Sequence, residues 1–189
     1  LDGTTAVLAS GERLAADVLV LATDDATAAT LRGDSRPAAP GRDAICLYFD
    51  APAPPVRGPW LILNGDGQGS VGTACALSEV ASGYAPLGRS LISVSLSGQP
   101  SLAGGDLQQA VRRQLREWFG EEVHVWRHLR TDHIKSALPP IEVLTAQASG
   151  ASPRVRPGLY QCGDYCETGT LDGALLSGRK AAEALLADH

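Results

Sequence analysis

The sequence contains no methionine, only two lysines and few aromatic residues. The lysines are Lys135 and Lys180, so most of the 16 basic residues are arginines. Together with 21 glycines and 12 prolines, this bias is typical of a GC-rich coding sequence and does not by itself indicate an arginine-based function. Because aromatic residues make up only 5% of the chain, a large aromatic cage for a ligand is not expected.

The sequence also lacks long apolar runs and an excess of positive charge. No run approaches the roughly 20 apolar residues of a transmembrane helix, and no signal peptide opens the chain. The formal net charge of −5 does not favour a nucleic acid or an anionic membrane surface as partner. We therefore expect a cytoplasmic protein with no nucleic-acid partner and no integral membrane segment.

The composition is otherwise that of a globular protein, with 44% hydrophobic and 20% charged residues among 189. One domain, or one domain with part of another, can bury roughly 70% of its unfolded surface at this length. The first residue is Leu1, and an initiator methionine is removed only before a small residue. We therefore expect that position 1 is not a natural start and that the sequence is a fragment of a longer chain.

The four cysteines could form two disulfides, but nothing indicates secretion, and we expect reduced thiols. Cys162 and Cys166 are separated by three residues, whereas a zinc knuckle or a redox dithiol has two. We expect one buried cysteine on a strand, one in the following loop, and no metal site.

The first 32 residues have the pattern of an α/β segment. Residues 17–22 are continuously apolar after Asp17, which is typical of a strand covered on both faces of a parallel sheet. Thr23 and Asp24 follow this strand, and residues 25–32 form an Ala-rich helix pattern. Since ligands gather at the carboxyl ends of strands in open α/β sheets, these two residues either line a site or cap the helix.

The centre of the chain has the pattern of a strand-rich insertion. Period-2 alternation and turn residues predict strands at 44–49, 60–63, 70–77, 90–97 and 123–129. An apolar stripe predicts a helix that Asp106 caps and that continues through Phe119. The glycine-rich segment 64–67 is interpreted as a hairpin turn, because a strand follows it and a P-loop would end in Lys-Ser/Thr.

On the predicted 123–129 strand, His124, Trp126 and His128 would share one face. The two histidines would then lie about 13 Å apart, too far to share a metal ion directly. Surface or hydrogen-bonded histidines are the interpretation we adopt.

The segment 158–186 carries the clearest functional pattern. A short buried strand, Leu159–Cys162, ends at Gly163 and Asp164, where glycine permits close backbone approach and the carboxylate can accept from a hydroxyl. A helix then begins near Leu171, and its first turn offers amides and partial positive charge to an anionic group. The residues fit either a polar-ligand site or a plain strand–loop–helix unit.

This segment resembles the carboxy-terminal flavin motif of the superfamily of FAD-dependent amine oxidases, protoporphyrinogen oxidases and phytoene desaturases. The matching residues are Gly163–Asp164, Asp172–Gly173–Ala174, Ser177–Gly178 and Ala181–Ala182. Residues 14–31 also resemble the segment with which the chain of those proteins re-enters its FAD domain for the second time. The centre of the chain matches only in its position and its strand-rich character.

The resemblance implies an α/β fold with an α+β insertion. A partial Rossmann-like FAD-binding domain would comprise residues 1–32 and 146–189, with a substrate-domain portion at 33–145. The strands predicted at 17–22 and 158–162 would then lie together in one sheet of that domain. FAD would then perform the redox chemistry, taking hydride from a C–N or C–C bond of a small or lipophilic substrate.

The resemblance also implies roles for particular residues. Asp164 would bind FAD near the pyrophosphate and ribityl chain, and the helix start would point at the pyrimidine end of the isoalloxazine. The expected cofactor-binding residues are Thr23, Gly163, Asp164, Leu171, Asp172, Gly173 and Ala174. Amine oxidases of the superfamily often use a lysine near the flavin, which makes Lys135 a catalytic candidate, with an ordinary exposed lysine as the alternative.

The sequence departs from the superfamily in one large respect: it has no strand–GxGxxG–helix fingerprint. The pyrophosphate cradle should therefore lie in a missing amino-terminal half, which we expect as a partner of this chain. Two functions stay open, namely part of an FAD-dependent oxidoreductase, inactive in isolation, and a truncated, non-catalytic interaction module that has lost flavin binding.

Overall fold

The computed structural model describes residues 4–34, 41–98, 104–140 and 152–188. The chain divides into two compact units. The end unit comprises Leu1–Arg42 and Ser136–His189, and the central unit comprises Asp43–Lys135. The domain boundaries at 32/33 and 145/146, and the roles given to the domains, stay predictions.

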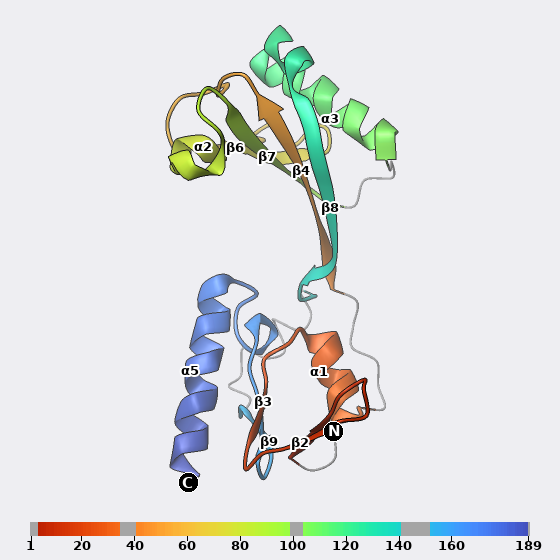
Figure 1. The fold of residues 1–189 in the computed structure, drawn as a ribbon, viewed down its shortest axis with the longest axis vertical. Helices are drawn as coiled ribbons and strands as arrows, with labels where there is room; N and C mark the ends of the chain where they lie inside the picture. Colours follow the sequence, from red (N-terminus) through yellow and green to blue (C-terminus); the bar gives the residue numbers. More distant parts are fainter. Residues whose placement is uncertain (1–3, 35–40, 99–103, 141–151, 189) are drawn as a thin grey trace. The chain divides into compact units, whose positions relative to one another are not determined.

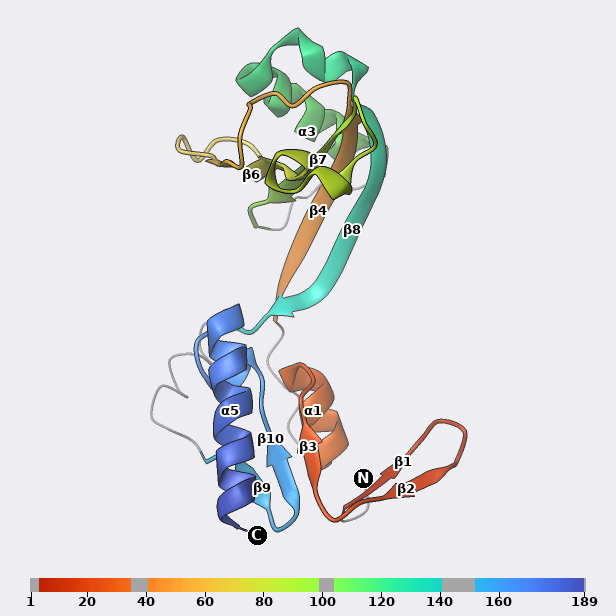
Figure 2. The same ribbon diagram turned by 60° about the vertical axis from the view of Figure 1, so that its left-hand side comes forward.

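The end unit contains a hairpin, a three-stranded sheet and two α-helices. The hairpin joins β1 (Thr5–Val7) to β2 (Arg13–Ala15), and the sheet has the order β3 (Leu19–Leu21), β10 (Leu159–Gln161), β9 (Arg154–Arg156). The helices are α1 (Asp25–Arg32) and α5 (Leu171–Ala187), and the 3₁₀ turn η3 (Asp164–Cys166) precedes α5. In both views α1 and α5 lie on either side of this sheet (Figures 1 and 2).

Strands β3 and β10 are parallel neighbours, with Leu159 opposite Leu19 and Gln161 opposite Leu21. Leu21, Leu159 and Tyr160 are buried, as expected for strands covered on both faces. This pairing confirms the prediction that the apolar strands near the two ends of the chain share one sheet. The strands are shorter than predicted, at three residues each.

Helix α1 has the predicted bounds, residues 25–32, and α5 begins at Leu171 as predicted. Asp24 caps α1 by accepting from the Thr27 amide, and Gly33 ends it at φ 78°, a left-handed conformation that glycine adopts without strain. Thr170 caps α5 by accepting from the Gly173 amide.

The central unit is a five-stranded sheet covered on one face by α3 (Gly104–Phe119). The sheet order is β5 (Leu61–Leu63), β6 (Val71–Ala76), β7 (Ser90–Leu96), β4 (Arg42–Ala51), β8 (Arg127–Leu138), with the short helices α2 (Leu77–Val80) and η1 (Ser82–Tyr84) between β6 and β7. Alternate residues of β4 and β7 are buried against Leu107, Val111 and Leu115 of α3. The predicted hairpin is present as the antiparallel pair β5–β6.

Two predictions in the central unit were wrong. Helix α3 begins at Gly104, so that Asp106 lies in its first turn and does not cap it. Of the predicted strand 123–129, residues 127–129 do lie in a strand, the start of β8, whereas residues 123–125 belong to the 3₁₀ helix η2 (Glu121–Val125).

The reason for the second error is local hydrogen bonding. The Trp126 amide donates to the Val123 carbonyl, which closes a 3₁₀ turn in place of a strand ladder. His124 therefore pairs with Glu121 at 2.8 Å, while His128 contacts the Thr131 hydroxyl at 2.8 Å. The histidines do not share a strand face, and Trp126 is buried in the core.

All four cysteines are free thiols. Within the described ranges, no three or more His, Cys, Asp and Glu side chains gather in a way that could hold a metal ion. The helices of this same part of the chain are too short or too polar to cross a bilayer.

Candidate functional site

A hollow of the end unit lies where its two parallel strands end. Because β3 and β10 run in the same direction, the chain leaves both strands at one edge of the sheet. The loop after β3 and the loop after β10 contribute Asp24 and Asp164 to the lining. The other lining residues are Asp25, Ala26, Gly41, Ser136, Ala137, Leu138, Pro139, Pro140 and Tyr165. The structure thus brings together two acidic residues that are distant in the sequence.

Asp24 serves as the cap of α1. Its Oδ1 accepts from the Thr27 amide at 3.0 Å, and its Oδ2 accepts from the Thr27 hydroxyl at 2.6 Å. These hydrogen bonds stabilise the carboxylate and lower the pKa of Asp24. Of the two interpretations of this residue, its contacts support the cap.

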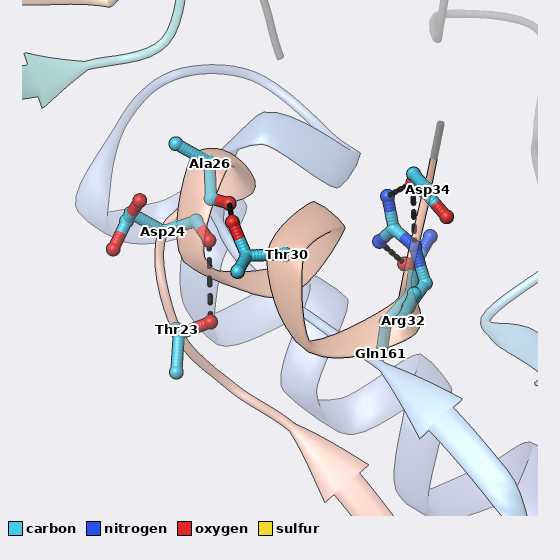
Figure 3. A network of polar contacts seen from close by, with 7 residues as sticks. All are labelled: Thr23, Asp24, Ala26, Thr30, Arg32, Asp34 and Gln161. Atoms are coloured by element: carbon cyan, nitrogen blue, oxygen red, sulfur yellow. Dashed lines mark hydrogen bonds and ion pairs between the residues drawn. The ribbon is translucent and has the colours of Figure 1, made fainter. Parts of the chain in front are cut away.

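Thr23 is exposed, and its hydroxyl donates to the Asp24 carbonyl at 3.2 Å (Figure 3). It is not among the residues that line the hollow. Its role toward the cofactor stays a prediction.

Gly163 is required by the packing of its own loop. Its backbone is extended, and a Cβ added there would lie 2.3 Å from Cε1 of the Tyr165 ring. Its amide donates to the buried Ser177 hydroxyl of α5 at 3.1 Å. The end of β10 is thus fastened to the helix that follows it.

Asp164 differs from Asp24 in how many of its carboxylate oxygens accept hydrogen bonds from the described residues. Its Oδ1 accepts from the Tyr165 amide at 2.8 Å. A carboxylate has about four acceptor positions, so the second oxygen retains capacity for a ligand hydroxyl.

Tyr165 and Ser177 are site residues whose roles the sequence reasoning missed. Tyr165 is 1% exposed, and its hydroxyl has no hydrogen-bond partner within the described residues. Burial, followed by the neighbouring Cys166, raises the pKa of Tyr165, and burial also raises that of Asp25. The available signal was position: Tyr165 directly follows the Gly-Asp pair, and Ser177 belongs to the Ser-Gly pair.

The start of α5 is held by the loop before it. The Thr170 hydroxyl accepts from the Gly173 amide at 3.0 Å, and the Thr170 carbonyl accepts from the Ala174 amide at 3.0 Å. Helix geometry leaves the amides of Leu171 and Asp172 without an intrahelical acceptor. Both residues are exposed. The first turn therefore retains two donors for an anionic or carbonyl group.

Gly173 is buried, and a Cβ there would lie 2.2 Å from the Thr168 carbonyl oxygen. Any side chain at this position would displace the loop that caps α5. The glycine therefore has a role in local packing, beside the predicted approach of a flavin.

Arg32 of α1 links this helix to β10 in a polar network that the sequence did not reveal (Figure 3). Its guanidinium donates to the Gln161 side chain and also binds Asp34, with Nη2 2.6 Å from the carboxylate. This network fixes α1 against the strand that leads to Asp164.

Lys135 lies on β8 in the central unit and is exposed. The cofactor-binding candidates all belong to the end unit. The catalytic role of Lys135 stays a prediction.

Comparison with known proteins gives one family and several similar structures. A family model described as flavin containing amine oxidoreductase matches residues 2–186. Among curated proteins, no sequence matches this chain.

Solved structures resemble the chain in fold at low sequence identity. A protein from Pyrococcus furiosus is 14% identical, with a TM-score of 0.67, and the match covers 98% of this chain and 45% of that protein. Reduced UDP-galactopyranose mutase is 12% identical with a TM-score of 0.67 over 100% of this chain and 45% of that one. Iminodiacetate oxidase from Chelativorans sp. BNC1 is 16% identical with a TM-score of 0.55, and the match covers 99% of this chain and 47% of that one. The chain thus spans slightly less than half the length of these proteins.

Proposed function

Because the chain belongs to the family of flavin-containing amine oxidoreductases, we propose that it supplies part of the cofactor site of an FAD-dependent oxidoreductase. The observation that carries this proposal is the position of Asp164 at the edge where parallel strands β3 and β10 end, in the 3₁₀ turn η3 of the loop that leads to helix α5. Ligands of open α/β sheets bind at such an edge.

The residues at this edge fit a flavin in their donor and acceptor types. Asp164 retains an acceptor oxygen for a ribityl hydroxyl. The first turn of α5 presents the amides of Leu171 and Asp172 to a carbonyl or anionic group.

When bound, FAD would supply the redox chemistry by accepting hydride from a C–N or C–C bond of a small or lipophilic substrate. The chain's own residues hold and orient the cofactor. Asp164 accepts from its polyol, and the amino terminus of α5 stabilises negative charge at the pyrimidine end. Ser177 and Gly173 keep these two groups in place, since they fix the β10 turn and the α5 cap.

A complete cofactor site needs more than this chain. The GxGxxG spacing occurs at Gly67, Gly69 and Gly72, but in the β5–β6 hairpin and not between a strand and a helix as in a dinucleotide-binding fingerprint. The similar solved proteins are about twice as long as this chain. We propose that the pyrophosphate cradle is supplied by a further amino-terminal half. Thr23 and Lys135 retain their proposed roles toward the cofactor and the substrate.

The decisive test is Asp164→Ala in the assembled protein that includes the amino-terminal half. Loss of one charge-assisted hydrogen bond costs roughly 1.5–3 kcal/mol, so that FAD affinity should fall about tenfold to a hundredfold. The measurement is flavin titration followed by fluorescence quenching. Asp66→Ala, in the β5–β6 turn of the central unit, is the matched control and should bind as the wild type does.

Unchanged affinity of the Asp164→Ala protein would show that this carboxylate does not contact the flavin. An assembled protein that binds no flavin would favour the alternative, a non-catalytic module of the same fold.

A further inference from the structure

The central unit has a hollow of its own, which we call the central hollow. It lies at the end of the five-stranded sheet where β4 ends and where β7 and β8 begin. Its volume is about 300 Å³, at the lower end of the range for small-molecule sites. All of its lining residues belong to the central unit, and none of them belongs to the flavin site proposed above.

One carboxylate and two arginines form the charged side of the central hollow. Nε of Arg89 donates to Oδ1 of Asp50 at 2.7 Å, and Nη2 of Arg127 donates to Oδ2 at 3.1 Å. The hydrogen bond from Arg89 lowers the pKa of Asp50, so that this carboxyl is ionised at neutral pH. Two positive charges and one negative charge leave the central hollow with an excess of one positive charge.

Each of the two guanidinium groups retains donors for a second anion. A guanidinium has five N–H donors in a planar fork, which matches the two oxygens of a carboxylate. Within the described residues, Arg89 and Arg127 each give Asp50 one of these donors and bind no other acceptor. Their side chains are 39% and 72% exposed, so a ligand can reach the remaining donors.

A tight turn and a strand fix the position of Arg89. The Arg89 amide donates to the Pro86 carbonyl at 3.0 Å, and Gly88 has φ 75°, the left-handed value that the third residue of a type II turn requires. The next residue, Ser90, begins β7 and is buried, with its hydroxyl 2.7 Å from that of Ser78. The guanidinium of Arg89 is therefore attached to defined backbone on both sides.

The opposite side of the central hollow is apolar. Its large side chains are those of Tyr84, Leu91 and Leu129. Tyr84 and Leu129 are 58% and 45% exposed, so the unit itself leaves much of their surface uncovered. Apolar walls beside a few polar groups with free donors are the usual composition of a small-molecule site.

We propose that the central hollow binds a small monocarboxylate with an apolar body, of the size of an arylacetate. The carboxylate accepts from the unused donors of Arg89 and Arg127 and neutralises the excess positive charge. The apolar body covers Tyr84 and Leu129. Inorganic phosphate fits less well, because it is partly dianionic at neutral pH and has no apolar part to cover these side chains.

The test is the binding of phenylacetate to the full 189-residue chain, followed by NMR chemical-shift titration. Phenylacetamide has nearly the same shape without the charge, and inorganic phosphate has the charge without the apolar body. Phenylacetate should bind at least tenfold more tightly than either of them. This comparison needs only the wild type and does not depend on the folding of a variant.

Arg127→Gln tests the assignment to this hollow. It removes one guanidinium, leaves Asp50 paired with Arg89, and should weaken phenylacetate binding at least tenfold. The matched control is Arg130→Gln, which changes an arginine of the same strand that is also 72% exposed, is paired with Asp132, and lies outside the hollow. This control should bind as the wild type does, and circular dichroism verifies that all three proteins fold alike.

Three results would overturn the proposal. The first is the absence of phenylacetate binding by the wild type at millimolar concentrations. The second is binding of phenylacetamide or phosphate as tight as that of phenylacetate, which would reject the class of ligand. The third is equal affinity of the Arg127→Gln and Arg130→Gln proteins for phenylacetate, which would place its binding elsewhere on the chain.

Discussion

Asp24 and Asp164 are the same residue type at equivalent places, since each follows a parallel strand of the end unit. Their hydrogen bonds give them different capacities. Both oxygens of Asp24 are engaged by Thr27, whereas among the described residues Asp164 has a hydrogen-bond partner only at Oδ1. These contacts distinguish a helix cap from a carboxylate that is proposed to bind a ligand, and position in the sequence does not specify them.

The cap leads to a prediction on stability. Asp24→Ala removes the acceptor of the Thr27 amide and should lower the free energy of unfolding by about 1 kcal/mol near neutral pH. Because the pKa of Asp24 is lowered in the folded state, its contribution is present above the ordinary value of 3.8 and is lost as the pH falls through the lower folded value. Urea denaturation followed by circular dichroism at neutral and acidic pH measures both effects.

Asp24→Asn is the control for this experiment, since asparagine caps a helix about as well and does not titrate. It should be nearly as stable as the wild type near neutral pH and should lack the acid-dependent loss. An alanine variant as stable as the wild type would contradict the role of Asp24 as a cap.

At the scale of elements, α3 is attached to the β5–β6 hairpin by one buried side chain. Oε1 of Gln114 accepts from the Val71 amide at 2.8 Å, and its Nε2 donates to the Gln68 carbonyl at 2.7 Å. Gly69 leaves room for this amide, because a Cβ there would lie 2.3 Å from Oε1. The glycine-rich turn that the sequence suggested as a hairpin therefore also receives a helix side chain.

Gln114→Leu keeps the bulk of this side chain and removes its hydrogen bonds. The buried Val71 amide would then lose its acceptor, which should destabilise the central unit by about 1–3 kcal/mol. Denaturation measures this loss, and amide hydrogen exchange should accelerate at Val71. Arg113→Leu changes an exposed neighbour on the same helix and should leave both unchanged. Equal stability of the Gln114 and Arg113 variants would argue against the attachment.

At the scale of the whole molecule, we propose that the chain holds one part of a cofactor site. In this proposal the end unit supplies Asp164 and the α5 amino terminus, and the sequence has no strand–GxGxxG–helix unit that could cradle a pyrophosphate. We therefore expect the isolated chain to bind FAD weakly or not at all. Supplied with its amino-terminal half, it should become yellow.

Fluorescence titration of FAD with the isolated chain and with the assembled protein tests this expectation. Riboflavin serves as a control. Because it lacks the pyrophosphate, its affinity should differ less than that of FAD between the isolated chain and the assembled protein. Tight, stoichiometric FAD binding by the isolated chain would refute the incomplete site.

The errors of the sequence-based prediction have physical causes. The alternation of Val123, Val125 and Arg127 with His124 and Trp126 fits a strand, but the chain there closes a 3₁₀ turn after Gly120. Hydropathy alternation does not distinguish these cases, because the backbone hydrogen bonds that decide between them are not encoded in side-chain polarity. The start of α3 was misplaced for a similar reason: Asp106 is a good cap residue that here lies inside the first turn.

The sequence by itself determined the elements whose signals are local. The residue pattern predicted the bounds of α1 and the start of α5, and the resemblance of both ends of the chain to the flavin superfamily predicted that β3 and β10 share a sheet. Only the tertiary structure decided what each site residue contacts. Arg32 meets Gln161 across 129 positions of sequence, and Ser177 holds Gly163 from the following helix. Such contacts depend on how separate elements pack, and hydrogen bonds are formed between atoms that only the folded chain brings within about 3 Å of one another.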